Sequence, residues 1–184
     1  NPNVHIITYN DNAGKGHAVK AGIAAATKAY TVFIDSDLDI SADHIKPFLE
    51  EMIMQDADIA IGSKMHKDSV IDYPLSRRIL SWGYCTFLHM VFRLRLKDTQ
   101  TGIKVYKTSV IQPISANTIT EDFAFDIEML LRAQNQHAKI IELPITLVFT
   151  RGKQNGLNRI KLKNIFHMFT NTLAVKKRIT KSIK

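Results

Sequence analysis

The sequence contains a single cysteine, and this scarcity excludes several classes of protein. Cys85 alone can form neither an internal disulfide framework nor a cysteine-rich zinc site, and low cysteine content is typical of a reducing compartment. The seven histidines show no spacing typical of metal ligands, and no serine or cysteine stands in a pattern typical of a catalytic nucleophile. No internal repeat, low-complexity linker or secretory signal peptide is recognisable. The 184 residues, 45% of them hydrophobic, are therefore expected to form one globular domain with at most an appended element.

The sequence also has no apolar run of the length that a membrane-spanning helix needs. The longest candidate, residues 79–92, is too short, and arginines stand close to it on both sides. This run is expected to form either a helix of the core or a helix lying in a membrane interface.

Acidic residues are absent from the C-terminal segment. Residues 1–150 contain 15 Lys and Arg against 17 Asp and Glu, whereas residues 151–184 contain 10 basic residues and no acid. The formal net charge of +8 therefore comes entirely from this segment. Such asymmetry favours an anionic partner, which could be a membrane, a nucleic acid or a phosphorylated molecule. We accordingly divide the chain into a domain with nearly balanced charge, 1–150, and a basic segment, 151–184.

The apolar residues recur with the periods of alternating strands and helices. A strand–helix–strand unit comes first, and parallel pairing by a right-handed crossover is the default for it. This alternation favours an α/β fold with helices flanking a mostly parallel sheet. Pro144 should make the last strand an edge strand or a bulged strand. The predicted strands are 4–9, 30–34, 58–62 and 140–149, with a further turn entering a strand over 98–106, and the predicted helices are 15–29, 42–55, 74–96 and 121–134.

Three acids spaced two apart follow the second predicted strand. In open α/β sheets ligands bind at the carboxyl ends of strands, which is where Asp35, Asp37 and Asp39 stand. Carboxylates suit a hard divalent cation, and such a cation can hold a diphosphate. Capping of the next helix is the alternative, and it would account for Ser41 or Asp43 but not for Asp35 and Asp37. The sequence therefore predicts a metal–nucleotide site here.

Gly14, Lys15 and Gly16 stand at the turn between the first strand and the first helix. They lack the longer glycine spacing of a phosphate-binding loop and the Ser or Thr that should follow its lysine. What remains is a modest anion site, made by Lys15 and the amides of a helix N-terminus. Glycines that only permit a tight turn are the alternative.

Arg77 and Arg78, with Ser81 one turn later, begin the predicted helix 74–96. Their donors could hold a phosphate through charge-assisted hydrogen bonds. Taken alone, such residues more often form a solvated start of a helix.

Two other polar groups are candidates for the same site. Asp98, Gln100 and Lys104 alternate along one predicted strand, so they could point into a cleft together or form a polar edge. Glu121 and Asp122 offer a general base, although acids at the start of a helix also serve as partners of its dipole.

The basic segment has the pattern of an amphipathic helix over residues 157–179. A basic amphipathic helix lies in a membrane interface, and each Lys or Arg near an anionic leaflet contributes about 1 kcal/mol. The alternative is a helix docked on the domain with a solvated charged face.

Taken together, these motifs resemble the family 2 glycosyltransferases with a GT-A fold. Within that family they are most similar to the polyprenyl-phosphate sugar transferases, which include the dolichyl-phosphate mannose and glucose synthases. No single motif is decisive, but their order along nearly the whole chain is that of the family. The matching segments are 12–18 with Gly22, 35–39, 62–64, 77–83, 98–104, 125–130 and 142–144.

The resemblance implies an inverting transfer of a hexose from a nucleotide sugar, of the UDP-glucose or GDP-mannose class, to a polyprenyl phosphate. The reaction would take place at the cytoplasmic face of the membrane and would use Mg²⁺ or Mn²⁺. Asp35, Ser36 and Asp37 would be the DxD motif that binds the donor, with Asp37 on the metal and Asp39 nearby. Asp39 stands where many mannose synthases have glutamine.

Other roles follow from the same resemblance. Arg77, Arg151 and Arg159 would hold phosphates of the donor or the acceptor. Asp122 lies where many family 2 enzymes carry their base, although a phosphate acceptor is already an anionic nucleophile. A family 2 enzyme acting on a cell-wall or other glycan is the alternative. A nucleic-acid-binding module is not expected, because aromatic and basic residues are not interleaved on any predicted strand face.

The chain departs from the family at both ends. The family's first strand–helix unit is missing and the chain starts at Asn1, so we expect that an N-terminal portion precedes it. The spanning helices of some bacterial relatives are also missing. The protein would then be monotopic, cut short, or dependent on a membrane-protein partner or a homo-oligomer.

Overall fold

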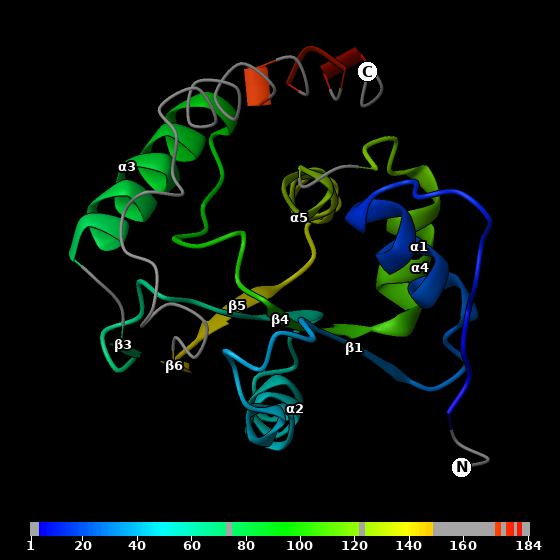
Figure 1. Cartoon of the computed structure of the whole chain (residues 1–184), viewed down its shortest axis with the longest axis horizontal. Helices are drawn as coiled ribbons and strands as arrows, with labels where there is room; N and C mark the ends of the chain where they lie inside the picture. The colour runs from blue at the N-terminus through cyan, green and yellow to red at the C-terminus, as the bar shows by residue number, and fades with distance from the viewer. Residues whose placement is uncertain are drawn as a thin grey trace.

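A four-stranded sheet with helices on both faces forms the body of the protein. The computed structural model describes residues 4–72, 75–121, 124–148, 172–173, 176–178 and 180–181, with the side chains of helix α3 described from residue 82 onward. Figure 1 shows α2 on one face of the sheet and α1, α3, α4 and α5 on the other. The elements are α1 (Lys15–Ala25), β1 (Tyr30–Ile34), the short 3-10 helix η1 (Ala42–His44), α2 (Ile45–Met54), β2 (Ile59–Gly62), β3 (Val70–Asp72), α3 (Leu75–Phe92), β4 (Ile103–Lys107), α4 (Thr108–Asn117), α5 (Phe125–Asn135), β5 (Ile140–Leu143) and β6 (Thr146–Val148).

The sheet is mixed, and β4 is the strand that makes it so. The strand order is β1-β4-β2-β5, in which β4 is antiparallel to both of its neighbours and β2 is parallel to β5. Three strands therefore run in one direction and β4 runs in the other. Phe33 of β1 lies opposite Lys104 of β4 in this register. The start of β4 thus lies beside the end of β1. The α/β class with a mixed sheet and flanking helices is confirmed, but two of the three strand pairings are antiparallel in a sheet expected to be mostly parallel.

Each face of the sheet has its own hydrophobic core, as the alternation of side chains along strands requires. In β2, Ile59 and Ile61 pack with α3, α4 and α5, whereas Ala60 between them packs with Phe48 and Met52 of α2. The chain enters α2 through Ser41, whose hydroxyl accepts a hydrogen bond from the Asp43 amide at 3.2 Å. This capping by Ser41 confirms one of the two roles considered for the residues after β1.

The predicted strand 4–9 does not form. Val4 and Ile6 are 64% and 84% exposed, and β1 pairs with β4 on one edge only. Among the described residues no strand lies on the other edge of β1, so the predicted parallel strand–helix–strand unit is wrong. The apolar alternation of residues 4–9 has no partner strand here, and a strand needs one because its backbone groups must pair.

Helix α4 and strand β3 were not predicted. Pro113 lies inside α4, where proline usually ends or kinks a helix, yet Ile111 and Ile114 are fully buried. The side chain of Gln112 donates hydrogen bonds to the carbonyls of Ile23 and Ala26, where α1 ends. The prediction for Pro144 is confirmed, because it separates the edge strand β5 from β6, which pairs with β3 in a second sheet.

Glu128 ties the connection between α4 and α5 to α5 itself. Its buried carboxylate accepts hydrogen bonds from the amides of Ile119 and Thr120, at 3.1 and 2.9 Å, and from the guanidinium of Arg132. Burial alone would raise the pKa of Glu128, but the hydrogen bonds from Thr120, Ile119 and Arg132 outweigh it and lower the pKa below the ordinary value of 4.5. The connection held in this way leads to Glu121, which faces α1.

We expect Glu128→Gln to lower the free energy of unfolding by about 2–3 kcal/mol at neutral pH, because a buried charged acceptor is lost. Since the pKa of Glu128 is lower in the folded protein, its contribution is fully present above the unfolded pKa. It is lost as the pH falls through the folded pKa. Urea unfolding from about pH 7 to about pH 3 should therefore show the two proteins converging in acid. The control Glu50→Gln removes an exposed partner of Lys46 and should change stability by less than about 0.5 kcal/mol. A gap independent of pH would contradict this role.

Candidate functional site

Asp35 lies where β1, α1 and the start of β4 meet. Its amide donates a hydrogen bond to the Gly102 carbonyl at 2.8 Å, and its carboxylate lies 2.8 Å from the Lys15 ammonium. Lys15 is the first residue of α1 and follows Gly14, whose φ of 93° favours glycine. The structure thus brings together two of the predicted site residues, Asp35 and Lys15, at the carboxyl end of β1.

Gly16 permits a close approach between α1 and the segment before α5. A Cβ on Gly16 would lie 2.8 Å from the Glu121 backbone and from Cβ of Phe125, and the Gly16 amide donates a hydrogen bond to the Glu121 carbonyl. The Glu121 carboxylate lies 3.3 Å from Nδ1 of His17 and 4.0 Å from Nζ of Lys20. Glu121 is therefore a contact of α1.

Residues 36–39 form a tight turn after Asp35. One carboxylate oxygen of Asp37 accepts a hydrogen bond from the Asp39 amide at 3.2 Å, and Leu38 has a φ of 64°. The Asp39 carbonyl accepts a hydrogen bond from Val148 of β6. Ser36 is exposed, and Asp37 is half-buried at the rim. The turn keeps the Asp37 carboxylate near the backbone while leaving part of it accessible.

The three acids do not form a ready-made cage for a metal ion. Among the described residues, no three His, Cys, Asp or Glu side chains come close enough to hold one ion together. The predicted ligand set of Asp35, Asp37 and Asp39 is thus not assembled, because the Asp35 carboxylate pairs with Lys15 and the Asp37 carboxylate bonds the turn. Mg²⁺ is usually bound by one or two carboxylates together with substrate phosphates, and Asp35 and Asp37 suit that arrangement.

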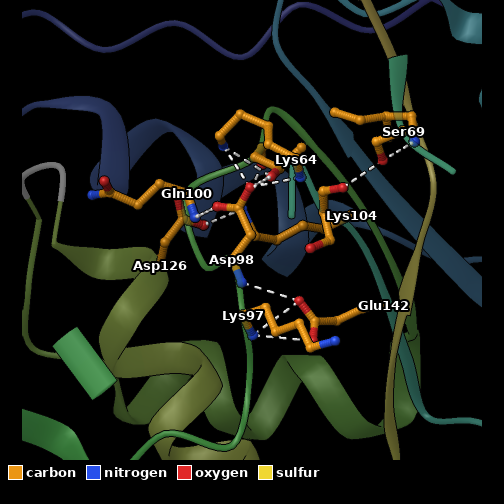
Figure 2. A network of polar contacts seen from close by, with 11 residues as sticks. Lys64, Ser69, Lys97, Asp98, Gln100, Lys104, Asp126 and Glu142 are labelled. Carbon is orange, nitrogen blue, oxygen red and sulfur yellow. Dashed lines mark hydrogen bonds and ion pairs between the residues drawn. The ribbon is translucent and has the colours of Figure 1, made fainter. Parts of the chain in front are cut away.

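Asp98 is buried among hydrogen-bond donors. Its side chain is 1% exposed, its carboxylate lies 2.6 Å from the Lys64 ammonium, and it accepts hydrogen bonds from the Lys64 amide and the Thr101 hydroxyl (Figure 2). Burial would raise the pKa of Asp98, but the charge of Lys64 and these hydrogen bonds lower it below its ordinary value. Asp98 therefore orders the loop 98–102, and its role in substrate binding stays a prediction.

The prediction that Asp98, Gln100 and Lys104 share one strand face is wrong. The strand begins only at Ile103, and Gln100 is exposed whereas Asp98 and Lys104 are buried. β4 is also an inner strand, so the residues do not form a polar edge. A carboxylate from β5, Glu142, accepts hydrogen bonds from the amides of Lys97 and Asp98 at 3.0 Å and fixes where the loop begins (Figure 2).

Lys104 is fully buried and is paired with a residue of α5 that was not among the predicted site residues. Its ammonium lies 2.9 Å from the Asp126 carboxylate and donates a hydrogen bond to the Thr101 carbonyl at 2.8 Å. Burial outweighs the effect of Lys104 and raises the pKa of Asp126 above its ordinary value. Lys15 and Lys104 both lie over the ring of Phe33, at 5.1 and 5.4 Å from its centre. The sequence did not indicate this pairing, because Asp126 looks like an ordinary acid in the first turn of a helix.

Several predicted site residues lie outside the described part of the chain. The side chains of Arg77, Arg78 and Ser81 on α3, and residues Asp122, Arg151 and Arg159, belong to this group, and their roles stay predictions.

Helix α3 is a core helix, which decides between the two forms expected for residues 79–92. Tyr84 and Leu88 are buried against the domain, while Trp82 and Met90 are exposed. The Tyr84 hydroxyl makes a hydrogen bond of 2.9 Å with the hydroxyl of Thr172, so this point of the basic segment contacts α3. Within the part of the chain that the structure describes, no helix combines the length and apolar character needed to cross a bilayer.

This arrangement of sheet, helices and carboxylates defines a GT-A-type fold. It is similar to the crystal structure of glucosyl-3-phosphoglycerate synthase from Mycobacterium tuberculosis in complex with Mn²⁺, uridine diphosphate and phosphoglyceric acid. The TM-score is 0.61 at 15% identity, and the match covers 97% of this chain and 56% of that one. At this identity the likeness shows the fold alone.

Residues 1–114 match the sequence model described as Glycosyl transferase family 2, and the chain belongs to that family. It is 30% identical over 152 residues to a dolichyl-phosphate beta-glucosyltransferase of Dictyostelium discoideum, covering 78% of this chain and 46% of that protein. It is 27% identical over 152 residues to an undecaprenyl-phosphate mannosyltransferase of Micrococcus luteus, covering 80% and 62%. The chain therefore spans only part of the length of these relatives.

Gly102 tests the geometry around Asp35. A Cβ at this position would lie 2.6 Å from Oδ2 of Asp35, so we expect Gly102→Ala to displace that carboxylate. Calorimetric titration with Mn²⁺ and UDP or GDP should show binding weakened about tenfold or more. The control Gly22→Ala places a methyl group on α1 where no atom lies within 4 Å, and it should leave binding unchanged. Equal binding by the Gly102→Ala variant and the parent protein would contradict this account.

Proposed function

We propose that this chain is the catalytic part of a glycosyltransferase that moves a hexose from a nucleotide sugar to a polyprenyl phosphate. The observation that carries the proposal is the pairing of Asp35 with Lys15 at the carboxyl end of β1, directly before the turn that holds Asp37, in a family 2 fold. Two relatives named for dolichyl phosphate and undecaprenyl phosphate support the class of acceptor. The proposed donor belongs to the UDP-glucose or GDP-mannose class.

The proposed reaction inverts the configuration of the sugar. An oxygen of the acceptor phosphate bonds to C1 of the hexose from the side opposite the leaving group. The bond between C1 and the diphosphate breaks at the same time, and its electron pair remains on the diphosphate oxygen. Negative charge therefore builds on the leaving diphosphate. Because the acceptor is already an anion, a strong general base at Asp122 is not required.

The chain's own residues would hold the two anions in place. Lys15 and the N-terminus of α1 would hold the diphosphate, since an anion at a helix N-terminus is favoured by the dipole. The Gly16 amide is not among these donors, because it is bonded to the Glu121 carbonyl. Asp35 and Asp37 would hold Mg²⁺ or Mn²⁺, and the bound ion would supply positive charge to the leaving group. Arg77 and Arg78, with Arg151 and Arg159, would bind phosphate of the acceptor or donor, and Ser81 would assist them.

Hexose transfer by the purified full-length protein tests the proposal. UDP-glucose and GDP-mannose would each be supplied with Mn²⁺, with a polyprenyl phosphate and separately with a soluble glycan acceptor, and the product identified by mass spectrometry. We expect glycosyl phospholipid, and we expect Asp37→Asn to slow its formation about 100-fold or more. The matched control Asp56→Asn alters a carboxylate that pairs with Lys107 at the other end of β4 and should have no effect.

Three outcomes would contradict different parts of the proposal. Transfer to the glycan alone would favour the alternative family 2 reaction, in which Asp122 would act as the base. No consumption of any nucleotide sugar would exclude the donor class. Full activity of the Asp37→Asn variant would exclude the role assigned to the turn after β1.

We also propose that the protein acts at the cytoplasmic face of a membrane, to which the basic segment 151–184 attracts it. Lys176, Lys177 and Arg178 are exposed on a helical stretch of this segment. Replacing all three with Gln should weaken flotation with anionic vesicles about 100-fold, at about 1 kcal/mol for each charge. The control replaces exposed Lys28, Lys46 and Lys67 of the domain. Equal losses in both triple variants would show that only net charge matters, which would contradict a localised binding segment.

A further inference from the structure

Two buried ion pairs hold the loop 98–102 from opposite ends. At its start, Asp98 is paired with Lys64, and the Thr101 hydroxyl donates to Asp98 while accepting from the Lys64 ammonium at 3.2 Å. At its end, Lys104 donates to the Thr101 carbonyl and is paired with Asp126. Thr101 is thus bound through its side chain to one ion pair and through its backbone to the other. The position of the next residue, Gly102, is fixed by both.

Gly102 in turn contacts both the backbone and the side chain of Asp35. The Asp35 amide donates to its carbonyl, and the Asp35 carboxylate occupies the space where a Cβ of residue 102 would stand. A shift of the loop therefore moves the first carboxylate of the proposed donor site. Continuous contacts of this kind link Asp126 on α5 to Asp35 through Lys104, Thr101 and Gly102.

Phe33 contacts both lysines of this region. The ammonium groups of Lys15 and Lys104 lie over its ring, and the Phe125 ring meets it edge-on at 6.3 Å between centres. Lys15 is paired with Asp35, and Lys104 is paired with Asp126. Lys104 has almost no exposed surface, so its charge acts on the arrangement of the protein and not directly on a ligand.

Stability alone gives a poor account of the buried pair. Removing two charges from water is costly, and replacement of a buried ion pair by apolar residues of similar volume is often neutral or stabilising. A methionine and a leucine would fill this part of the core, but neither could donate to the Thr101 carbonyl. What the ion pair adds is a directed hydrogen bond at the base of the loop.

We propose that Lys104 and Asp126 are positioning residues that fix the Asp35 carboxylate through the loop 98–102. The proposal rests on the function proposed above for Asp35, but the position of Asp35 can be measured without any ligand. Lys104 acts through the Thr101 carbonyl, and Asp126 holds the lysine in the direction that this hydrogen bond requires.

The decisive variant is the double replacement Lys104→Met with Asp126→Leu in the full-length protein. It removes the hydrogen bond to Thr101 without leaving a buried charge unpaired, so its midpoint of urea unfolding should equal or exceed that of the parent protein. Hydrogen exchange resolved to single amides should show the Asp35 amide exchanging about tenfold faster, because its acceptor carbonyl is less firmly held. Binding of Mn²⁺ in the presence of UDP or GDP should weaken about tenfold.

Two further variants complete the experiment. Lys107→Met removes a lysine from the other end of β4 and should change neither the exchange of Asp35 nor Mn²⁺ binding. Asp126→Asn keeps Lys104 and an acceptor oxygen, so it should have a smaller effect than the double variant, and it serves as the test if the double variant does not fold.

The results separate this proposal from the proposed function. Unchanged exchange of the Asp35 amide in a variant as stable as the parent protein would overturn the positioning role. In that case the ion pair would contribute only to stability, and its replacement by residues of equal stability would leave the Asp35 amide unaffected. Faster exchange in a protein whose parent form binds no Mn²⁺ with either nucleotide would support the positioning role and overturn the proposed function. Faster exchange together with weakened binding supports both.

Discussion

The burial of two lysine–aspartate pairs beside β4 is the constraint on which the site depends. Lys64 with Asp98 and Lys104 with Asp126 are almost entirely removed from water, and such pairs persist only where further hydrogen bonds satisfy them. Those further bonds come from the loop between the pairs. Because β4 runs antiparallel to β1, this loop arrives at the end where β1 leaves the sheet. The mixed topology and the buried charges therefore determine together where Asp35 lies.

The exposed ion pair of Lys15 and Asp35 can change partners when ligands bind, whereas the buried ion pairs cannot. Lys15 and Asp35 neutralise each other while both are about one-third exposed. A cation at Asp35 and a phosphate at Lys15 would give each residue a new partner of the same sign as the one it loses. Exposed ion pairs are weak, on the order of 1 kcal/mol or less, so separating this one costs little. The buried pairs cannot be separated so easily, and they are therefore suited to holding the loop 98–102 in place.

The sequence was enough to propose where the candidate site lies, but it did not predict the buried contacts that support Asp35. An apolar strand followed by Asp35 and Asp37 is a local pattern, and the order of the motifs was enough to indicate the fold. The strand expected at 4–9 failed because apolar alternation does not specify a partner strand. Lys104 was assigned to an open face because the alternation was read from Asp98, five residues before the strand begins at Ile103. Its pairing with Asp126 on α5 joins distant residues, and periodicity carries no information about such contacts.

A charged acceptor changes what this kind of site has to provide. With a phosphate nucleophile no proton has to be removed before attack, so accurate placement of fixed charges matters more than a tuned base. The pKa shifts found at Asp98, Asp126 and Glu128 belong to buried groups that hold segments in place. Glu128 fixes the connection that carries Glu121 to α1, and Asp98 and Asp126 fix the loop under Asp35. The buried charged groups of this domain therefore fix the positions of the segments around the carboxyl end of β1. An ionic nucleophile and an ionic leaving group would need to be aligned there.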